Sequence, residues 1–235
     1  AACRAQARGR RLARPRRPPD RGLSSLDQRD DDDRTGLTAA DDDAATPESR
    51  AAAVQDARRA LEAVGSVPDL AGTAVAVMGV SGSGKTVLAL RLAAALGVPF
   101  AEADEFHSPE AVAKMAGGTP LTDADRLPWL HRIRDWTAGA AAERGAIVTC
   151  SALKRSYRDL LRDGPARVVF LHVDAPQSEI RDRMARRRHY MPPTLLHSQA
   201  ATLEPLEADE PGAVLANDST VEDLTERALR VLAAR

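Results

Sequence analysis

Aromatic residues are scarce in this chain, and cysteines are almost absent. Of its 235 residues, 43% are apolar but only 3% are aromatic, so Ala, Val and Leu must fill most of a core. Cys3 and Cys150 are too few for a disulfide framework, which favours a reducing compartment such as the cytoplasm. The length fits one domain with an extension, or at most two small domains.

The sequence also lacks a net charge and a long apolar run. A formal charge of −1 provides no overall field to attract nucleic acid or an acidic membrane. No interleaved aromatic residues offer a platform for stacking bases. No apolar run approaches the roughly 20 residues of a membrane span, and none follows the basic start as in a secretory signal. We therefore expect no nucleic-acid partner and no membrane association.

The first 45 residues differ in composition from the rest. Arg, Ala and Pro dominate residues 1–21, and aspartate runs follow at 30–33 and 41–43. Neither block has apolar periodicity, so burial cannot offset the entropy of ordering it. We predict a disordered leader over residues 1–45; the alternatives are an Arg-rich targeting or anion-binding arm, or sequence outside the mature protein. The initial Ala, in place of Met, suggests processing, truncation or a misplaced start.

Residues 46–72 are predicted to form a short helix and a linker. Thr46 and Pro47 suit the N-cap and first helical positions, and apolar residues then recur at helical spacing. This helix either packs on the next domain or stands free. Residues 73–235 alternate apolar strands with helices, which is typical of a parallel sheet covered on both faces. The predicted strands lie near residues 73–78, 98–103, 146–150, 167–173 and 213–216.

The first of these strands runs into a glycine-rich turn and then a helix. Gly79, Gly84, Lys85 and Thr86 complete the pattern G-x-x-x-x-G-K-[ST] in the context that a phosphate-binding loop requires. Glycines let backbone N–H groups turn toward an anion, and the helix N-terminus adds its dipole. Lys85 is expected to reach the β- and γ-phosphates and Thr86 to ligate Mg²⁺. The alternative is a turn that only links strand to helix. The predicted phosphate-binding residues are Gly79, Ser81, Gly82, Ser83, Gly84, Lys85 and Thr86.

Two polar clusters follow the next predicted strands. One runs from Asp104 to His107 and the other from Ser151 to Lys154. Ligands of open parallel sheets bind beyond the carboxyl ends of the strands, so we expect both clusters beside the phosphate loop. Asp104 is a candidate to accept a proton from an attacking hydroxyl or to orient that hydroxyl; a helix cap or an Mg²⁺-associated carboxylate is the alternative. His107 is either a substrate contact or a structural loop residue.

Several cations are candidates for binding an anionic substrate or the phosphates. Lys114, Arg126 and Lys154 could pair with an anionic substrate group, although each alone also suits a solvated surface. A basic cluster before Pro192 suits a mobile lid over the ATP phosphates, with a solvated basic face as the alternative. Its members are Arg181, Arg183, Arg186, Arg187, Arg188 and His189.

Motifs beyond the phosphate loop resemble the gluconokinase family of carbohydrate kinases. D-E-F-H at 104–107 precedes K-M-A-G-G-T-P-L-T-D-A-D-R-L-P-W-L at 114–130. C-S-A-L-K-R-S-Y-R-D-L-L-R occupies 150–162. R-R-H-Y-M-P at 187–192 precedes S-Q-A-A-T-L-E-P-L-E-A-D-E at 198–210. These motifs extend over nearly all of the chain after residue 75 and are much more specific than the phosphate loop alone.

The resemblance implies a fold, a reaction and partners. The fold is a three-layer α/β P-loop NTPase domain with a parallel five-stranded sheet, like that of nucleoside monophosphate kinases. The reaction is transfer of phosphate from ATP to D-gluconate with Mg²⁺, giving 6-phospho-D-gluconate for central carbon metabolism, and the assembly is a homodimer. Lys85, Asp104 and Lys154 are carried over as catalytic residues, and Arg183 and Arg187 are expected to contact the nucleotide. The expected substrate-binding residues are Asp104, His107, Lys114, Arg126, Ser151, Lys154, His189 and Gln199.

The chain departs from the family pattern at four positions. Ala103 stands where Gly is usual and Ser108 where Pro is usual, which bears on loop rigidity. Arg188 replaces a common Gly and Ala200 a common aromatic residue, which bears on lid geometry and substrate fit. Two other functions stay open: another small-metabolite kinase of the shikimate-kinase type, and a catalytically altered nucleotide-binding module. The first would have a Gly-rich loop in place of residues 151–154, and a GTP switch would need an N-K-x-D segment, which the sequence lacks.

Overall fold

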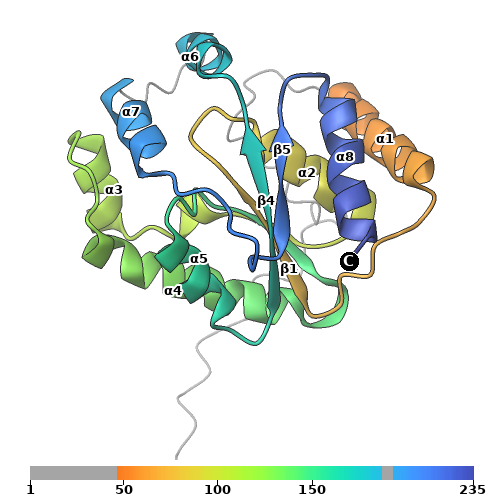
Figure 1. The fold of residues 1–235 in the computed structure, drawn as a ribbon, viewed down its shortest axis with the longest axis horizontal. Helices are drawn as coiled ribbons and strands as arrows, with labels where there is room; N and C mark the ends of the chain where they lie inside the picture. Colours follow the sequence, from red (N-terminus) through yellow and green to blue (C-terminus); the bar gives the residue numbers. More distant parts are fainter. Residues whose placement is uncertain (1–46, 187–192) are drawn as a thin grey trace, which may run out of the picture. The chain divides into compact units, whose positions relative to one another are not determined.

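One parallel sheet organises the part of the chain that the structure describes. The computed structural model describes residues 47–186 and 193–235, so the charged leader lies outside the described residues. The strands are hydrogen-bonded in the order β2-β3-β1-β4-β5, and each pair is parallel (Figure 1). This confirms the predicted five-stranded parallel sheet. The strands are β1 Thr73–Met78, β2 Phe100–Glu102, β3 Ala146–Thr149, β4 Arg167–Asp174 and β5 Gly212–Ala216.

Helices cover both faces of the sheet, which gives the three predicted layers (Figure 1). Helices α4 and α5 pack on one face, and α1, α2 and α8 pack on the other. No helix within residues 47–186 and 193–235 is both long and apolar enough to cross a membrane. The helices are α1 Pro47–Val64, α2 Lys85–Leu96, the 3₁₀ helix η1 Ala103–Phe106, α3 Pro109–Ala116, α4 Asp123–Arg144, α5 Arg155–Arg162, α6 Gln177–Arg186, α7 Pro193–Thr202 and α8 Val221–Ala233.

The alternation of β1 explains how a sequence poor in aromatic residues fills two cores. Ala74 and Ala76 face the α4 and α5 layer, where Trp129, Tyr157 and Phe170 supply the bulk. The valines of β1 face the other layer, which is filled mainly by Leu, Val and Ala from α2 and α8. Side chains of a strand alternate between the two faces, so small residues on one side accommodate the large aromatic rings there.

Helix α1 packs on the second layer. Ala57 is fully buried, and Leu61 and Val64 lie against the apolar cluster shared by α2 and α8. Of the two arrangements left open for this helix, the structure shows packing on the sheet domain. The burial of an amphipathic face supplies most of the stability of such a helix.

The second strand is shorter than predicted. Pro99 has no N–H to donate to a ladder, although its carbonyl accepts a hydrogen bond from the Ile147 N–H at 2.8 Å. The strand therefore begins at Phe100 and ends at Glu102, where η1 starts. This early turn places Asp104 in a short helix beyond the edge of the sheet.

Candidate active site

The phosphate loop joins β1, the central strand, to α2. Gly79 has φ 138°, and a Cβ atom there would lie 2.6 Å from the Val173 carbonyl oxygen and 2.9 Å from Ser83 Oγ. Only glycine combines this backbone conformation with such close neighbours. Gly84, at φ 103°, is the residue before α2, so the loop leads directly into the N-terminus of this helix. The loop is therefore shaped as the sequence motif predicts, to bind phosphate through its backbone.

Residues from other strands hold this loop in place. The Asn217 side-chain amide donates to the carbonyl of buried Ser83 at 2.7 Å, and its backbone N–H donates to the Asp174 carbonyl at 2.6 Å. Asn217 was not predicted, although a polar residue directly after the last strand was a usable signal. Lys85 Nζ donates to the Val80 carbonyl at 2.9 Å, so its ammonium lies over the loop.

Helix α7 contacts the phosphate loop through one predicted residue. Gln199 Oε1 accepts a hydrogen bond from the Ser81 backbone N–H at 2.8 Å. The structure thus places Gln199 against the phosphate loop, whereas the sequence predicted a contact with the accepting substrate. The other predicted lid contacts, the Arg183 side chain, Arg187 and His189, lie outside the described residues.

A carboxylate that was not predicted lies next to the phosphate loop. Glu102 ends β2, accepts a hydrogen bond from the Thr149 hydroxyl, and keeps its buried Oε1 without a hydrogen-bond partner among the described residues. Burial raises the pKa of Glu102 and the Asp104 carboxylate adds to this rise, while the hydroxyls of Thr149 and Thr86 and the Lys85 ammonium oppose it. Glu102, Thr86 and Lys85 therefore share one small region. The burial of Glu102 depends on β3, which explains why its local sequence did not single it out.

Asp104 lies in η1, two residues beyond Glu102. Its side chain is exposed, and its charge acts on both Glu102 and His107. Asp104 follows the carboxyl end of β2 and the phosphate loop follows the carboxyl end of β1, and both strands pair in parallel with β3. The predicted donor residue and the predicted proton acceptor therefore lie at the same end of the sheet.

His107 stacks on Trp129 beside Asp104. The ring centroids are 4.6 Å apart and the planes differ by 7°, while Trp129 Nε1 donates to the Ala103 carbonyl at 2.6 Å. Burial lowers the pKa of His107, and Arg126 and Arg132 add to this, whereas the Asp104 carboxylate opposes it. A neutral imidazole with its Nδ1 buried and unpartnered among the described residues can accept a hydrogen bond from a substrate hydroxyl.

Two predicted substrate cations meet around Tyr157. Lys154 Nζ lies 2.9 and 2.8 Å from the two carboxylate oxygens of Asp123, and the Tyr157 hydroxyl donates to the same carboxylate at 2.5 Å. The Arg126 guanidinium lies 4.0 Å from Asp123 and 5.9 Å from the Tyr157 ring centroid. The Asp123 carboxylate raises the pKa of Lys154, and Lys154 in turn lowers the pKa of Asp123. Asp123 was not among the predicted site residues, yet it is the internal counter-ion of this cationic site.

The remaining predicted residues lie nearby with different surroundings. Lys114 pairs with Asp125 at 2.5 Å, and Asp125 also forms the capping box of α4 with Thr122. Lys114 therefore ties α3 to the start of α4. Ser151 begins the segment after β3 that ends at Lys154; these two residues are partly exposed, whereas Ala152 and Leu153 between them are buried.

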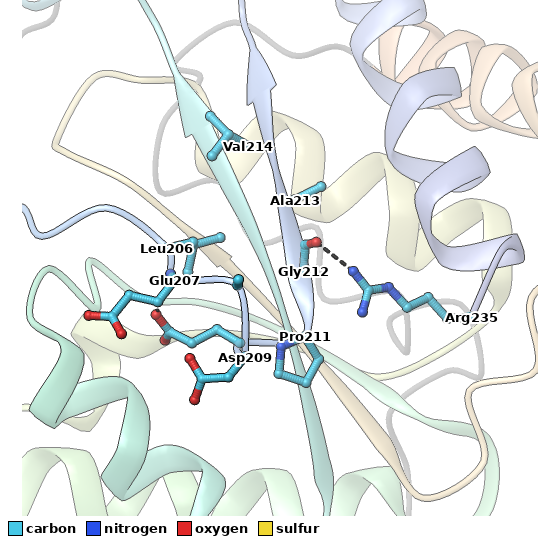
Figure 2. Close-up of a pocket in the computed structure, with 10 residues that line it drawn as sticks. Leu206, Glu207, Asp209, Pro211, Gly212, Ala213, Val214 and Arg235 are labelled. Carbon is cyan, nitrogen blue, oxygen red and sulfur yellow. Dashed lines mark hydrogen bonds between the residues drawn. The ribbon is translucent and has the colours of Figure 1, made fainter.

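A shallow surface pocket of about 590 Å³ lies away from all of these groups. It is formed by residues 206–214 and Arg235, whose guanidinium donates to the Gly212 carbonyl (Figure 2). No residue predicted to bind substrate or nucleotide lines it. The candidate active site therefore lies beyond the carboxyl ends of β1, β2 and β3.

The chain is similar in sequence to known gluconokinases. The AAA domain family matches residues 75–206. The chain is 53% identical over 137 residues to a gluconokinase of Gluconobacter oxydans (57% of this chain, 77% of the relative), and 46% identical over 144 residues to the thermosensitive gluconokinase of Escherichia coli (60% and 76%).

Solved structures show the same relationship. A sugar kinase from Janibacter superposes with a TM-score of 0.65 at 56% identity, covering 68% of this chain and 94% of that one. A gluconokinase from Sinorhizobium meliloti superposes with a TM-score of 0.63 at 39% identity, covering 69% and 93%. Because gluconokinases at 53% and 46% identity match it over about three quarters of their own length, this chain belongs to the gluconokinase family of P-loop kinases.

Proposed function

We propose that this protein transfers the γ-phosphoryl group of ATP to a hydroxyl of D-gluconate, giving ADP and 6-phospho-D-gluconate. The observation that carries this proposal is the arrangement of three groups at the carboxyl ends of the strands: the phosphate loop, Asp104, and the cations Lys154 and Arg126. The chain that holds them is a member of the gluconokinase family. No feature of the site favours the shikimate-kinase alternative or a binding module without catalysis.

The donor half binds and neutralises the phosphates. The loop of residues 79–86 and the N-terminus of α2 would bind the phosphates through backbone N–H groups, and the Lys85 ammonium, which lies over the loop at the Val80 carbonyl, would bind the β- and γ-phosphates. Such preorganised donors stabilise the charge that develops on the transferred group.

The acceptor half binds the sugar acid and receives its proton. Lys154 and Arg126 provide the positive charge that a substrate carboxylate requires. The acceptor hydroxyl oxygen forms a bond to the γ-phosphorus as the bond from that phosphorus to the β–γ bridging oxygen breaks. Asp104 takes or orients the hydroxyl proton as this happens.

Thr86 and Glu102 are the residues that would hold Mg²⁺. The residues described contain no group of three or more His, Cys, Asp or Glu side chains that could bind a metal alone. Mg²⁺ commonly binds one or two protein oxygens, with waters and substrate phosphates completing its shell. The buried, unpartnered Glu102 Oε1 beside Thr86 fits that requirement. The ion would neutralise negative charge on the β- and γ-phosphates.

A coupled assay of ADP production across a panel of sugar acids tests this function. We expect ADP release that depends on gluconate and disappears in Lys85→Ala. Turnover with another sugar acid but not with gluconate would contradict the proposed substrate and support the proposed phosphoryl transfer. ATP binding without turnover, whatever the acceptor, would contradict the kinase function.

The family resemblance also leads us to propose residues 73–235 as the kinase domain, with α1 packed on it. We further propose a cytoplasmic homodimer without a nucleic-acid partner. Light scattering of the purified full chain at several concentrations checks the oligomeric state.

A further inference from the structure

A fully buried ion pair lies behind the acceptor site. Arg158 of α5 and Glu210, just before β5, both have side chains that are 0% exposed. Arg158 Nε donates to Glu210 Oε1 at 2.6 Å, and its Nη2 donates to Oε2 at 2.8 Å. Burial would raise the pKa of Glu210, but Arg158 and the Glu207 backbone N–H outweigh it and lower this pKa, which keeps the carboxylate ionised.

The remaining Arg158 donors hold two separate segments. Nη1 donates to the carbonyls of Ala152 at 3.3 Å and Leu153 at 3.4 Å, in the segment that ends at Lys154. It also donates to the Glu204 carbonyl at 3.0 Å, while Nη2 donates to the Pro205 carbonyl at 2.9 Å. One guanidinium therefore joins the acceptor segment, residues 151–154, to the return segment, residues 203–210, which follows α7.

These two segments also bond directly to each other. The Glu204 N–H donates to the Leu153 carbonyl at 2.7 Å, and Glu204 Oε2 accepts from the Arg155 N–H at 2.5 Å. On the outer side, Arg155 pairs with Glu207 and Asp209, two of the carboxylates drawn in Figure 2. The return segment is thus fixed to the start of α5 by both buried and surface contacts.

The acceptor segment needs such support because its backbone is strained. Ala152 has φ 41°, and it is the one non-glycine residue with positive φ among the residues described. A left-handed conformation is unfavourable for an alanine and persists only where its surroundings impose it. Arg158 bonds the Ala152 carbonyl itself and the next one along, so it acts directly on the conformation that presents Lys154.

We propose that Arg158 and Glu210 are positioning residues for phosphoryl transfer, holding the acceptor segment and the return segment in one arrangement. This inference rests on the proposed function. The acceptor segment presents Lys154, and the return segment continues from α7, whose Gln199 bonds the phosphate loop. The pair therefore fixes the position of the acceptor segment relative to the phosphate loop without touching either substrate.

A positioning role can be distinguished from a purely stabilising role by replacing the ion pair with apolar residues. A buried ion pair is often no more stabilising than well-packed apolar residues of similar volume, whereas removal of one partner is costly. An apolar pair at these two positions should therefore restore stability but remove the Arg158 hydrogen bonds from four backbone carbonyls, of which Leu153 keeps the Glu204 N–H as a donor.

The test compares Arg158→Met, the double variant Arg158→Met with Glu210→Leu, and the full wild-type chain. We expect the single variant to melt at a lower temperature and the double variant to recover most of that loss. The double variant should still show kcat/KM for gluconate reduced at least about tenfold, because misplacement of reacting groups costs rate. Its Kd for ATP should change less than about twofold, and amide exchange of residues 151–155 should become faster.

A control removes a partly exposed ion pair on the other face of the sheet. Arg91 of α2 lies 2.9 Å from Glu222 of α8 and 3.9 Å from Asp56 of α1, and Arg91→Met with Glu222→Leu should leave kcat/KM for gluconate unchanged. Wild-type kcat/KM in a folded Arg158/Glu210 double variant would overturn the positioning role. If the double variant does not fold, Arg158→Lys decides: it keeps the charge but not the fork of donors, and an unchanged kcat/KM would overturn the proposal. A wild-type chain inactive on gluconate would instead contradict the proposed function.

Discussion

The donor and acceptor halves of the site are built in opposite ways. The proposed donor half is one continuous stretch, residues 79–86, and it would bind phosphate through its backbone. The acceptor half combines side chains from η1, α4 and the segment after β3. A motif carried by the backbone is visible in any sequence that contains it, whereas a site made of side chains depends on how distant segments meet.

The two halves also differ in how their charges are balanced. The acceptor cation Lys154 already has a carboxylate partner in Asp123, and Lys114 has one in Asp125. The donor half instead places a partly buried carboxylate, Glu102, against Thr86 and Lys85. An anionic acceptor must therefore compete with a protein carboxylate, while the donor phosphates meet a loop of N–H groups.

The largest effect is expected from Asp104→Asn, which removes the proposed proton acceptor. Loss of a general base costs about 10²- to 10⁴-fold, so kcat for gluconate should fall by that factor while the Kd for ATP stays within about twofold. Steady-state kinetics and a separate ATP titration measure the two quantities. Glu105→Gln, at the neighbouring exposed carboxylate, is the control and should leave kcat unchanged. Equal losses in both variants would mean that Asp104 has no special role.

A second comparison sets two glycines against each other. Gly79→Ala introduces a Cβ 2.6 Å from the Val173 carbonyl oxygen at a positive φ, so ATP affinity should fall by at least about tenfold and the melting temperature should drop. Gly139, inside α4, has no neighbouring atom within 4 Å of such a Cβ. Gly139→Ala should raise the melting temperature by about 2–4 °C, since Ala is the better helix former. Calorimetry and ATP titration check both, and normal ATP affinity in Gly79→Ala would contradict the tight fit of the loop.

The contributions of Lys154 and its counter-ion Asp123 to substrate binding can be separated by changing each residue alone. Lys154→Met removes a charged hydrogen-bond donor, so KM for gluconate should rise by about 10- to 100-fold with KM for ATP unchanged. Asp123→Asn frees Lys154 from its protein partner and should lower KM for gluconate by up to about fivefold. Initial-rate kinetics on both variants provide the test. A higher KM in Asp123→Asn would show that Asp123 binds the substrate itself.

The smallest effect concerns pH and His107. Its pKa in the folded protein lies below that of the unfolded chain, chiefly because of burial, with Arg126 and Arg132 adding to this and Asp104 opposing it. The unfolded state therefore binds the proton more readily, and stability should fall as pH drops through the ordinary histidine pKa of about 6.5. Melting curves from pH 7.5 to 5.5 should show a weaker pH dependence in His107→Gln than in wild type. His172, whose pKa burial also lowers, supplies a remaining part of the slope.

Most of the fold could be predicted because its signals are local. The apolar runs of β1 and β4 are long enough to identify as buried strands, and both strands begin where the sequence pattern places them. The phosphate loop was predictable for the same reason. The candidates Asp104, Arg126 and Lys154 came from their residue types and from the position of Asp104 and Lys154 after predicted strands, and the family resemblance supported all three.

The residues that were missed act through tertiary contacts. Glu102 stands directly before η1, but its burial comes from Thr149 on the neighbouring strand. Asn217 holds a loop that lies 134 positions earlier in the chain. Asp123 looks like an ordinary residue of a helix start until Lys154 and Tyr157 are placed against it. No periodicity or motif in a single sequence encodes such pairings.

The concentration of aromatic residues on one face of the sheet places both tryptophan fluorophores on that face. Both tryptophans of the chain, Trp129 and Trp136, belong to α4, and Trp129 stacks on His107. The donor stretch from β1 through α2 contains no aromatic residue. Intrinsic tryptophan emission therefore comes entirely from the acceptor side, so binding of the sugar acid can be followed without a label while nucleotide binding at the loop is comparatively silent.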